Sequence, residues 1–131
     1  MPLRVGIDLV SADSVRDSLQ AHGERYLERI YSEREVADCR TAGTVDPERL
    51  AGRFAAKEAA IKVLRPGDDP VPWRDIEVRR DVTGWVELRL TGRAAALASD
   101  AGIEDLALSL THERGLASAI VIAEIRRAAD K

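Results

Sequence analysis

The sequence predicts an α+β protein, and three observations support that prediction. An alternating strand pattern opens the chain, a long run with helical spacing occupies its middle, and four further strand-like segments fill the second half. The chain has 131 residues, enough for one compact core with little room for a second. We therefore expect a single domain over residues 1–131.

The segment at residues 3–9 predicts a strand with one face in the core. Its large apolar residues alternate with polar or small ones, which is the period of a half-buried strand: Leu3, Val5, Ile7 and Leu9. Asp8 falls between them, so we expect it to point away from the apolar row.

Helix signals follow this strand. Ser11 or Asp13 is placed to cap a helix that Gly23 ends, and a short second helix covers residues 23–30. Ser32 and Glu35 then have the spacing of a capping box at the start of a third helix.

The mid-chain helix is predicted over residues 47–64. Asp46 and Pro47 suit its N-cap and first turn, and Pro66 with Gly67 ends it. At about 3.6 residues per turn, one side is large and apolar and the opposite side is small. The large side comprises Leu50, Phe54, Ile61 and Leu64, and the small side comprises Gly52, Ala56, Ala59 and Val63.

Three charged residues are out of place on a helix that looks covered on both sides. Glu58 and Lys62 share a flank, and Lys57 falls close to the large apolar side. A surface ion pair, worth about 0.2–0.5 kcal/mol, explains Glu58 and Lys62 without any function. A side chain that keeps its ammonium in water equally explains Lys57.

Asp8 favours a functional interpretation, because an acid in an apolar strand needs a cation, a metal or backbone donors. If Asp8 and Glu58 converge, they offer the hard oxygen ligands that Mg²⁺ prefers. Lys57, Lys62 and Arg53 then face the phosphates of a substrate, as phosphoryl transfer requires.

The second half predicts two strand pairs and a helix. Residues 75–80 and 85–90 form a hairpin around "DVTG", with Trp85 opening its second strand. A helix follows, capped by Thr91 and ended by Gly102. Residues 106–112 and 115–125 form strands around the turn "HERG". The last strand is apolar on both faces, which predicts a central position in the sheet.

Composition excludes several classes of protein. Twenty Lys and Arg against 23 Asp and Glu give a net charge of -3, which disfavours nucleic-acid binding. The single cysteine, Cys39, rules out an internal disulfide, and no Cys and His spacing suits zinc. The start is too short an apolar run for a signal peptide, and no segment reaches membrane-spanning length, so we expect a soluble cytoplasmic protein without a membrane partner. A Walker-type glycine loop is absent, which disfavours a nucleotide-hydrolysing domain.

Three motifs together resemble the holo-acyl-carrier-protein synthase family, the small 4'-phosphopantetheinyl transferases. They are "GIDLV", "LAGRFAAKEAAIKVL" and "LSLTHE", in that order and at matching separations over nearly the whole chain. "GRFAAKEA" is the most specific of them. The resemblance implies a mainly antiparallel sheet packed with helices, one domain per subunit of a homotrimer. It also implies transfer of 4'-phosphopantetheine from coenzyme A to a serine of an acyl carrier protein, leaving adenosine 3',5'-bisphosphate.

The resemblance also assigns roles to residues. Asp8 and Glu58 match the family's two Mg²⁺ ligands, and Lys62 matches the lysine near the pyrophosphate, which makes Glu58 and Lys62 the catalytic candidates. The serine proton goes to Glu58 or to a water on the metal. Positions around the coenzyme A phosphates are matched by Arg53, Lys57, Ser109 and His112. In the family each site lies between neighbouring subunits, with the two acids from one subunit and other coenzyme contacts from the next.

The chain departs from the family at two places. Ser14 stands where the family has an arginine that faces the acidic carrier, and nearby acids dilute the field of the possible substitutes Arg16, Arg25 and Arg29. Trp85 and Val86 follow Gly84 where the family often has a basic residue and a proline. These departures leave open a noncatalytic coenzyme A-binding or assembly module on the same fold. His112 has a plainer explanation too, as a brace for the turn "HERG".

Overall fold

The computed structural model describes residues 2–126, so the ends of the predicted domain range, residue 1 and residues 127–131, lie outside the described part. A three-stranded antiparallel sheet has the order β1-β7-β6. Its strands are β1 (Leu3–Ser11), β6 (Ile103–Glu113) and β7 (Leu116–Ile125). The prediction of a central last strand is confirmed.

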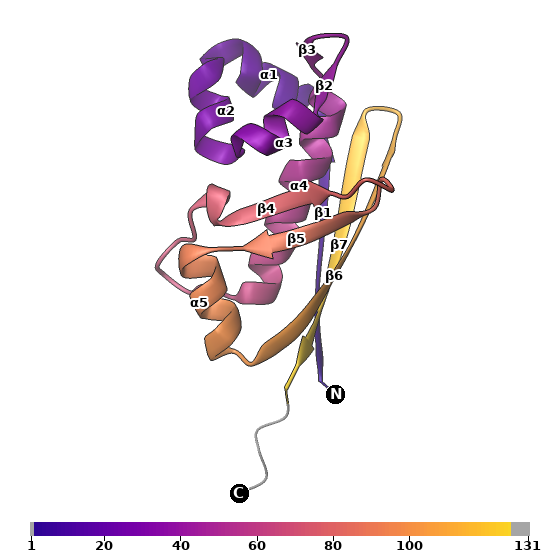
Figure 1. Ribbon diagram of the computed structural model, residues 1–131. Helices are drawn as coiled ribbons and strands as arrows, with labels where there is room; N and C mark the ends of the chain where they lie inside the picture. The colour runs from indigo at the N-terminus through magenta and orange to yellow at the C-terminus, as the bar shows by residue number, and fades with distance from the viewer. Residues whose placement is uncertain (1, 127–131) are drawn as a thin grey trace, which may run out of the picture.

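The long helix α4 (Pro47–Leu64) runs along one face of this sheet (Figure 1). Asp46 caps it by accepting a hydrogen bond from the Glu48 backbone amide at 2.9 Å, and Arg65 ends it in the left-handed conformation. The large apolar side of α4 and the small side are both covered, because the sheet lies on one side and other elements lie on the other. The prediction of a helix enclosed on two sides is therefore correct.

Three short helices pack together beside the first turns of α4 (Figure 1). They are α1 (Ala12–His22), α2 (Glu24–Ile30) and α3 (Glu33–Asp38). Ser11 caps α1, Gly23 ends it, and Ser32 with Glu35 forms the predicted capping box. Two strands of two residues each, β2 (Arg40–Thr41) and β3 (Thr44–Val45), were not predicted, because segments so short have no readable period.

A separate hairpin crosses α4 on the side away from the sheet (Figure 1). It consists of β4 (Ile76–Arg80) and β5 (Val86–Leu90), preceded by the short turn η1 (Trp73–Asp75) and followed by α5 (Gly92–Asp100). The predicted hairpin is confirmed, although β5 begins at Val86 and leaves Trp85 in the turn. Within residues 2–126, no helix is both long and apolar enough to cross a bilayer.

The two faces of β1 are the reverse of the prediction. Leu3, Val5, Ile7 and Leu9 have exposed fractions between 59% and 64%, whereas Gly6 and Val10 are buried. The face that includes Asp8 packs towards α4, and the guanidinium of Arg4 donates a hydrogen bond to the Val63 carbonyl there at 2.9 Å. The alternating pattern predicted the strand correctly but did not reveal which face this chain covers by itself.

Candidate functional site

The approach of β1 to α4 depends on Gly6. A Cβ atom at this position would overlap the carbonyl oxygen of Ala59, so only glycine lets the two backbones come so close. Glycine within a strand often marks such an approach. Gly6 was not among the predicted site residues. A glycine inside a strand, two residues before Asp8, was the one feature of the sequence that could have indicated this close approach.

The close approach brings Asp8 and Lys62 together. Nζ of Lys62 lies 3.6 Å from Oδ1 of Asp8 and donates a hydrogen bond to the Ile7 carbonyl at 2.7 Å. The Asp8 side chain is 22% exposed and that of Lys62 is 53% exposed. The cation therefore sits at the rim of the β1–α4 contact, where a ligand from solvent can still reach it.

Glu58 joins this pair. Its pKa is raised above the ordinary glutamate value, first by partial burial and second by the negative charge of Asp8, while Lys62 opposes the shift. Glu58 precedes Lys62 by one helical turn on the same flank of α4, so its carboxylate lies beside the pair of Lys62 and Asp8. Asp8, Glu58 and Lys62 thus form one cluster, a convergence that the sequence alone left open.

The donor set of this cluster suits Mg²⁺. Two carboxylates offer hard oxygen ligands, and Mg²⁺ is commonly held by one or two carboxylates plus substrate phosphates and waters. Among residues 2–126, no group of three or more His, Cys, Asp and Glu side chains is arranged to hold a metal ion.

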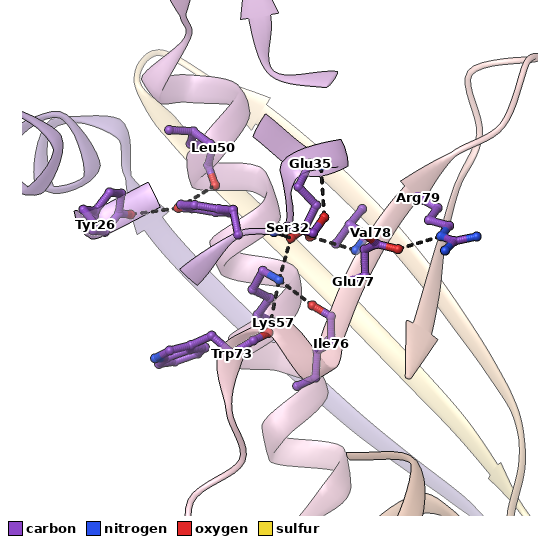
Figure 2. A network of polar contacts seen from close by, with 11 residues as sticks. Tyr26, Ser32, Glu35, Leu50, Lys57, Trp73, Ile76, Glu77, Val78 and Arg79 are labelled. Carbon is purple, nitrogen blue, oxygen red and sulfur yellow. Dashed lines mark hydrogen bonds and ion pairs between the residues drawn. The ribbon is translucent and has the colours of Figure 1, made fainter. Parts of the chain in front are cut away.

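Lys57 does not join the cluster, which corrects the expectation that it faces coenzyme phosphates. Its side chain is fully buried on another side of α4 (Figure 2). Nζ donates to Oε1 of Glu35 at 2.8 Å, to the Trp73 carbonyl at 3.2 Å, and to the Ile76 carbonyl. All three ammonium protons are accounted for inside the fold, so Lys57 neither reaches water nor is free to bind a phosphate.

Glu35 is the acid that makes this burial possible. Besides Lys57, its carboxylate accepts hydrogen bonds from the backbone amides of Ser32 at 2.9 Å and Val78 at 2.8 Å (Figure 2). Glu35 is therefore both the capping-box residue of α3 and the counter-ion that ties α3 and β4 to α4. The local sequence indicates only the cap, not the ion pair with Lys57.

The remaining predicted site residues lie in a groove of about 320 Å³ between α4, β6 and the β4–β5 turn. Arg53, Ser109 and His112 all line it. Nδ1 of His112 lies 2.6 Å from Oε1 of Glu48 on α4, so the imidazole contacts the helix rather than bracing its own turn. Arg49 and Arg80 add further positive charge to the groove.

Arg53 is the unusual residue of this groove. It is only 3% exposed, and its Nε and Nη2 atoms have no hydrogen-bond partner among the described residues. A buried guanidinium without partners is unfavourable, because its desolvation is uncompensated. The groove therefore has the character of a site for an anion.

The groove and the acidic cluster lie on different sides of α4. Lys62 follows Arg53 by nine positions, which places the two side chains about 180° apart around the helix axis. A single chain consequently does not bring all the predicted residues into one site. Asp8, Glu58 and Lys62 form one group, and Arg53, Ser109 and His112 form another.

A second, basic groove lies beside α1 and α2. It has a volume of about 530 Å³, and two of the predicted carrier-facing arginines, Arg25 and Arg29, line it with His22, Tyr26 and Trp73. Arg16 is not part of it and instead forms an ion pair with Asp13 at 2.5 Å. The basic groove thus retains positive charge although Ser14 contributes none.

Comparison with known sequences gives a consistent family. Residues 4–117 match the 4'-phosphopantetheinyl transferase superfamily. The chain is similar to the holo-[acyl-carrier-protein] synthase of Paramagnetospirillum magneticum, with 44% identity over 98% of this chain and 100% of the relative. It is also similar to the synthase of Halothermothrix orenii, with 42% identity over 92% of this chain and 95% of the relative.

Comparison with solved structures identifies the same family. A Chronobacterium ammoniagenes ACPS–CoA complex superposes with a TM-score of 0.84 and 34% identity, covering 97% of this chain and 100% of that one. The Helicobacter pylori holo-[acyl-carrier-protein] synthase in complex with coenzyme A gives a TM-score of 0.80 and 26% identity, covering 92% and 100%.

Proposed function

Because the chain belongs to the 4'-phosphopantetheinyl transferase superfamily, among the holo-[acyl-carrier-protein] synthases, we propose that it transfers 4'-phosphopantetheine from coenzyme A to a serine of an acyl carrier protein. The main structural support is the cluster of Asp8, Glu58 and Lys62, which combines two carboxylates with a cation at the rim of the β1–α4 contact. This is the combination that phosphoryl-group transfer from a pyrophosphate requires.

In the proposed step, the serine oxygen attacks the β-phosphorus of coenzyme A. A new O–P bond forms, the bond from that phosphorus to the bridging oxygen breaks, and adenosine 3',5'-bisphosphate leaves. Glu58 accepts the serine proton, a role that suits a partly buried carboxylate beside Lys62 at the rim of the β1–α4 contact. Lys62 stabilises negative charge on the phosphate oxygens.

Asp8 and Glu58 are the residues that would hold Mg²⁺. Bound there, the ion would add positive charge beside the pyrophosphate. A carboxylate has two oxygens, so Glu58 has one for a metal and one for the serine proton. The neighbouring Lys62 ammonium stays near Asp8 at 3.6 Å and supplies a second cation for the same phosphates.

The separation of the two groups around α4 supports a site shared between subunits of a homotrimer. In this arrangement Asp8, Glu58 and Lys62 of one subunit meet Arg53, Ser109 and His112 of its neighbour around one coenzyme A. The exposed apolar row of β1 supports assembly as well, because its register places Val5 beside the exposed Ile122 on β7. A face of this kind on a folded chain favours burial against another copy.

The basic groove beside α1 and α2 is the proposed docking surface for the carrier. Arg25 and Arg29 supply positive charge for an acidic partner, and Tyr26 and Trp73 supply apolar contact area. Arg16 is instead paired with Asp13, which neutralises its charge. We therefore expect the chain to accept some carriers and to discriminate against others.

Intact-mass analysis of apo carriers tests the proposal. A panel of carriers is incubated with the protein, Mg²⁺ and coenzyme A, and the mass of one phosphopantetheine is expected on at least one of them. Lys62→Ala is expected to reduce transfer at limiting coenzyme A while keeping the fold, because alanine preserves helix propensity. Coenzyme A binding without transfer to any carrier would instead identify a noncatalytic module.

A further inference from the structure

Trp85 is the most exposed aromatic side chain among residues 2–126. It is 77% exposed, lies in the β4–β5 turn, and lines the groove that contains Arg53. Tryptophan is large and apolar, so a position open to water is unfavourable unless a partner covers it. The proposed chemistry of Asp8, Glu58 and Lys62 does not use this residue.

The turn holds Trp85 in a defined place. Oδ1 of Asp81 accepts hydrogen bonds from the backbone amides of Thr83 at 2.8 Å and Trp85 at 3.2 Å. The Asp81 amide in turn donates to the Trp85 carbonyl at 2.9 Å. The indole is therefore exposed on an ordered backbone, which lowers the entropy lost when a ligand packs on it.

The groove combines this indole with unpaired positive charge. Arg53 has two buried nitrogen atoms without partners, and Arg80 lies in the same groove next to the hairpin turn. A ligand that satisfies both features carries an anionic group for the guanidinium and a flat ring for the indole. Nucleotides are the common class of molecule with both.

We propose that Trp85 is a specificity residue that stacks on the adenine ring of coenzyme A while Arg53 binds a phosphate of the same nucleotide. The inference rests on the proposed function for the identity of the nucleotide. The resembling family often has a basic residue and a proline after the glycine of this turn, whereas this chain has Trp85 and Val86 after Gly84. The chain thus has an aromatic residue where the family often has a basic one.

Tryptophan fluorescence provides a direct test, because the chain has only two tryptophans. Trp73→Phe leaves Trp85 as the sole emitter and keeps an aromatic ring beside Phe54, where Trp73 packs with a centroid distance of 5.1 Å. Coenzyme A and adenosine 3',5'-bisphosphate are expected to quench this emission. Phosphopantetheine, which has no adenine, is expected to leave it unchanged. Equal quenching by phosphopantetheine would overturn the proposal.

Calorimetry on the chain with Trp73 intact gives a second measurement. Trp85→Leu is expected to raise the Kd for coenzyme A about 10-fold, and Trp85→Phe only about twofold, because phenylalanine keeps a stacking face. Light scattering on each variant reports whether Trp85 instead packs against another copy. Unchanged affinity of Trp85→Leu, or an affinity loss that follows the loss of assembly, would reject stacking.

The outcomes separate this inference from the proposed function. Transfer by the wild-type chain together with unchanged coenzyme A affinity in Trp85→Leu rejects the role of Trp85 alone. Quenching by adenosine 3',5'-bisphosphate without transfer to any carrier rejects the transferase and keeps the stacking contact. In the transfer assay, loss of stacking in Trp85→Leu is expected to raise KM for coenzyme A.

Discussion

Gly6 of β1 lies directly against the carbonyl oxygen of Ala59 on α4, with no room for a Cβ between them. Asp8 follows Gly6 on the same face of the strand, and Glu58 precedes Ala59 on the helix. The closeness of one glycine to one carbonyl therefore sets the separation of the two carboxylates. The proposed catalytic arrangement depends here on a residue that has no functional group.

Gly6→Ala is expected to separate β1 from α4. The added methyl group meets backbone rather than a flexible side chain, so we expect destabilisation of about 1–3 kcal/mol and a larger relative loss of transfer. Gly52→Ala is the matched control for stability, because its Cβ would come no closer than 3.9 Å, to Leu110. Thermal melting and transfer rates check both variants. A fully stable and active Gly6→Ala would contradict the close contact.

Glu58→Gln is expected to raise the melting temperature by about 1–3 °C in neutral buffer without Mg²⁺. Burial and Asp8 raise the folded-state pKa of Glu58, so the folded chain binds this proton more tightly than the unfolded chain. The charged carboxylate is therefore destabilising at neutral pH, and this effect disappears as the pH falls through the raised pKa towards 4.5.

Mg²⁺ supplies the companion measurement. It is expected to raise the melting temperature of the wild type, because a bound cation relieves repulsion between Asp8 and Glu58, and to have little effect on Glu58→Gln or Asp8→Asn. Both variants should transfer poorly at any Mg²⁺ concentration. A melting response to Mg²⁺ that neither substitution alters would place the metal elsewhere.

Two inactive variants are expected to restore activity when mixed. If each site takes Asp8 from one subunit and Arg53 from the next, trimers that contain both Asp8→Asn and Arg53→Ala have one intact site. Random exchange at equal amounts then gives about a quarter of wild-type activity. The mixture is denatured and refolded together, and separately refolded samples mixed afterwards are the control. No recovery in co-refolded trimers would indicate a site within one chain.

Glu35→Gln is expected to destabilise the protein by about 3–5 kcal/mol, because it leaves the fully buried Lys57 ammonium without its counter-ion. The paired change Glu35→Gln with Lys57→Met removes that unpaired charge and should recover much of the loss. Urea denaturation measures all four members of the cycle. Additive effects of the two substitutions would show that the ion pair contributes no coupling.

Much of the fold was predictable because its signals are local. Ser11, Ser32 and Asp46 cap helices where their short polar side chains precede apolar periodicity. The central position of β7 followed from its apolar character on both faces. The Glu58 and Lys62 flank followed from helical spacing alone, since the two residues lie four positions apart in a continuous helix.

The features that were not predicted depend on contacts between segments that are distant in the sequence. Lys57 pairs with Glu35, which is 22 positions away in the chain. No local pattern shows that Glu35, the capping-box residue of α3, is also the counter-ion of a lysine on α4. The apolar row of β1 looked like a core face, because a period of two identifies faces without revealing what covers each one. The role of Gly6 was not predicted, because it depends on contact with the Ala59 carbonyl of α4, which is far away in the sequence.

The exposed apolar row on β1 has a consequence for how the enzyme behaves on dilution. If subunit contact buries these leucines, valine and isoleucine, the share of chains with a complete site follows mass action. Activity per chain would then fall at low concentration and recover with a lag after concentration. The quantity of working sites in a cell would be a steep function of expression level rather than a simple multiple of it.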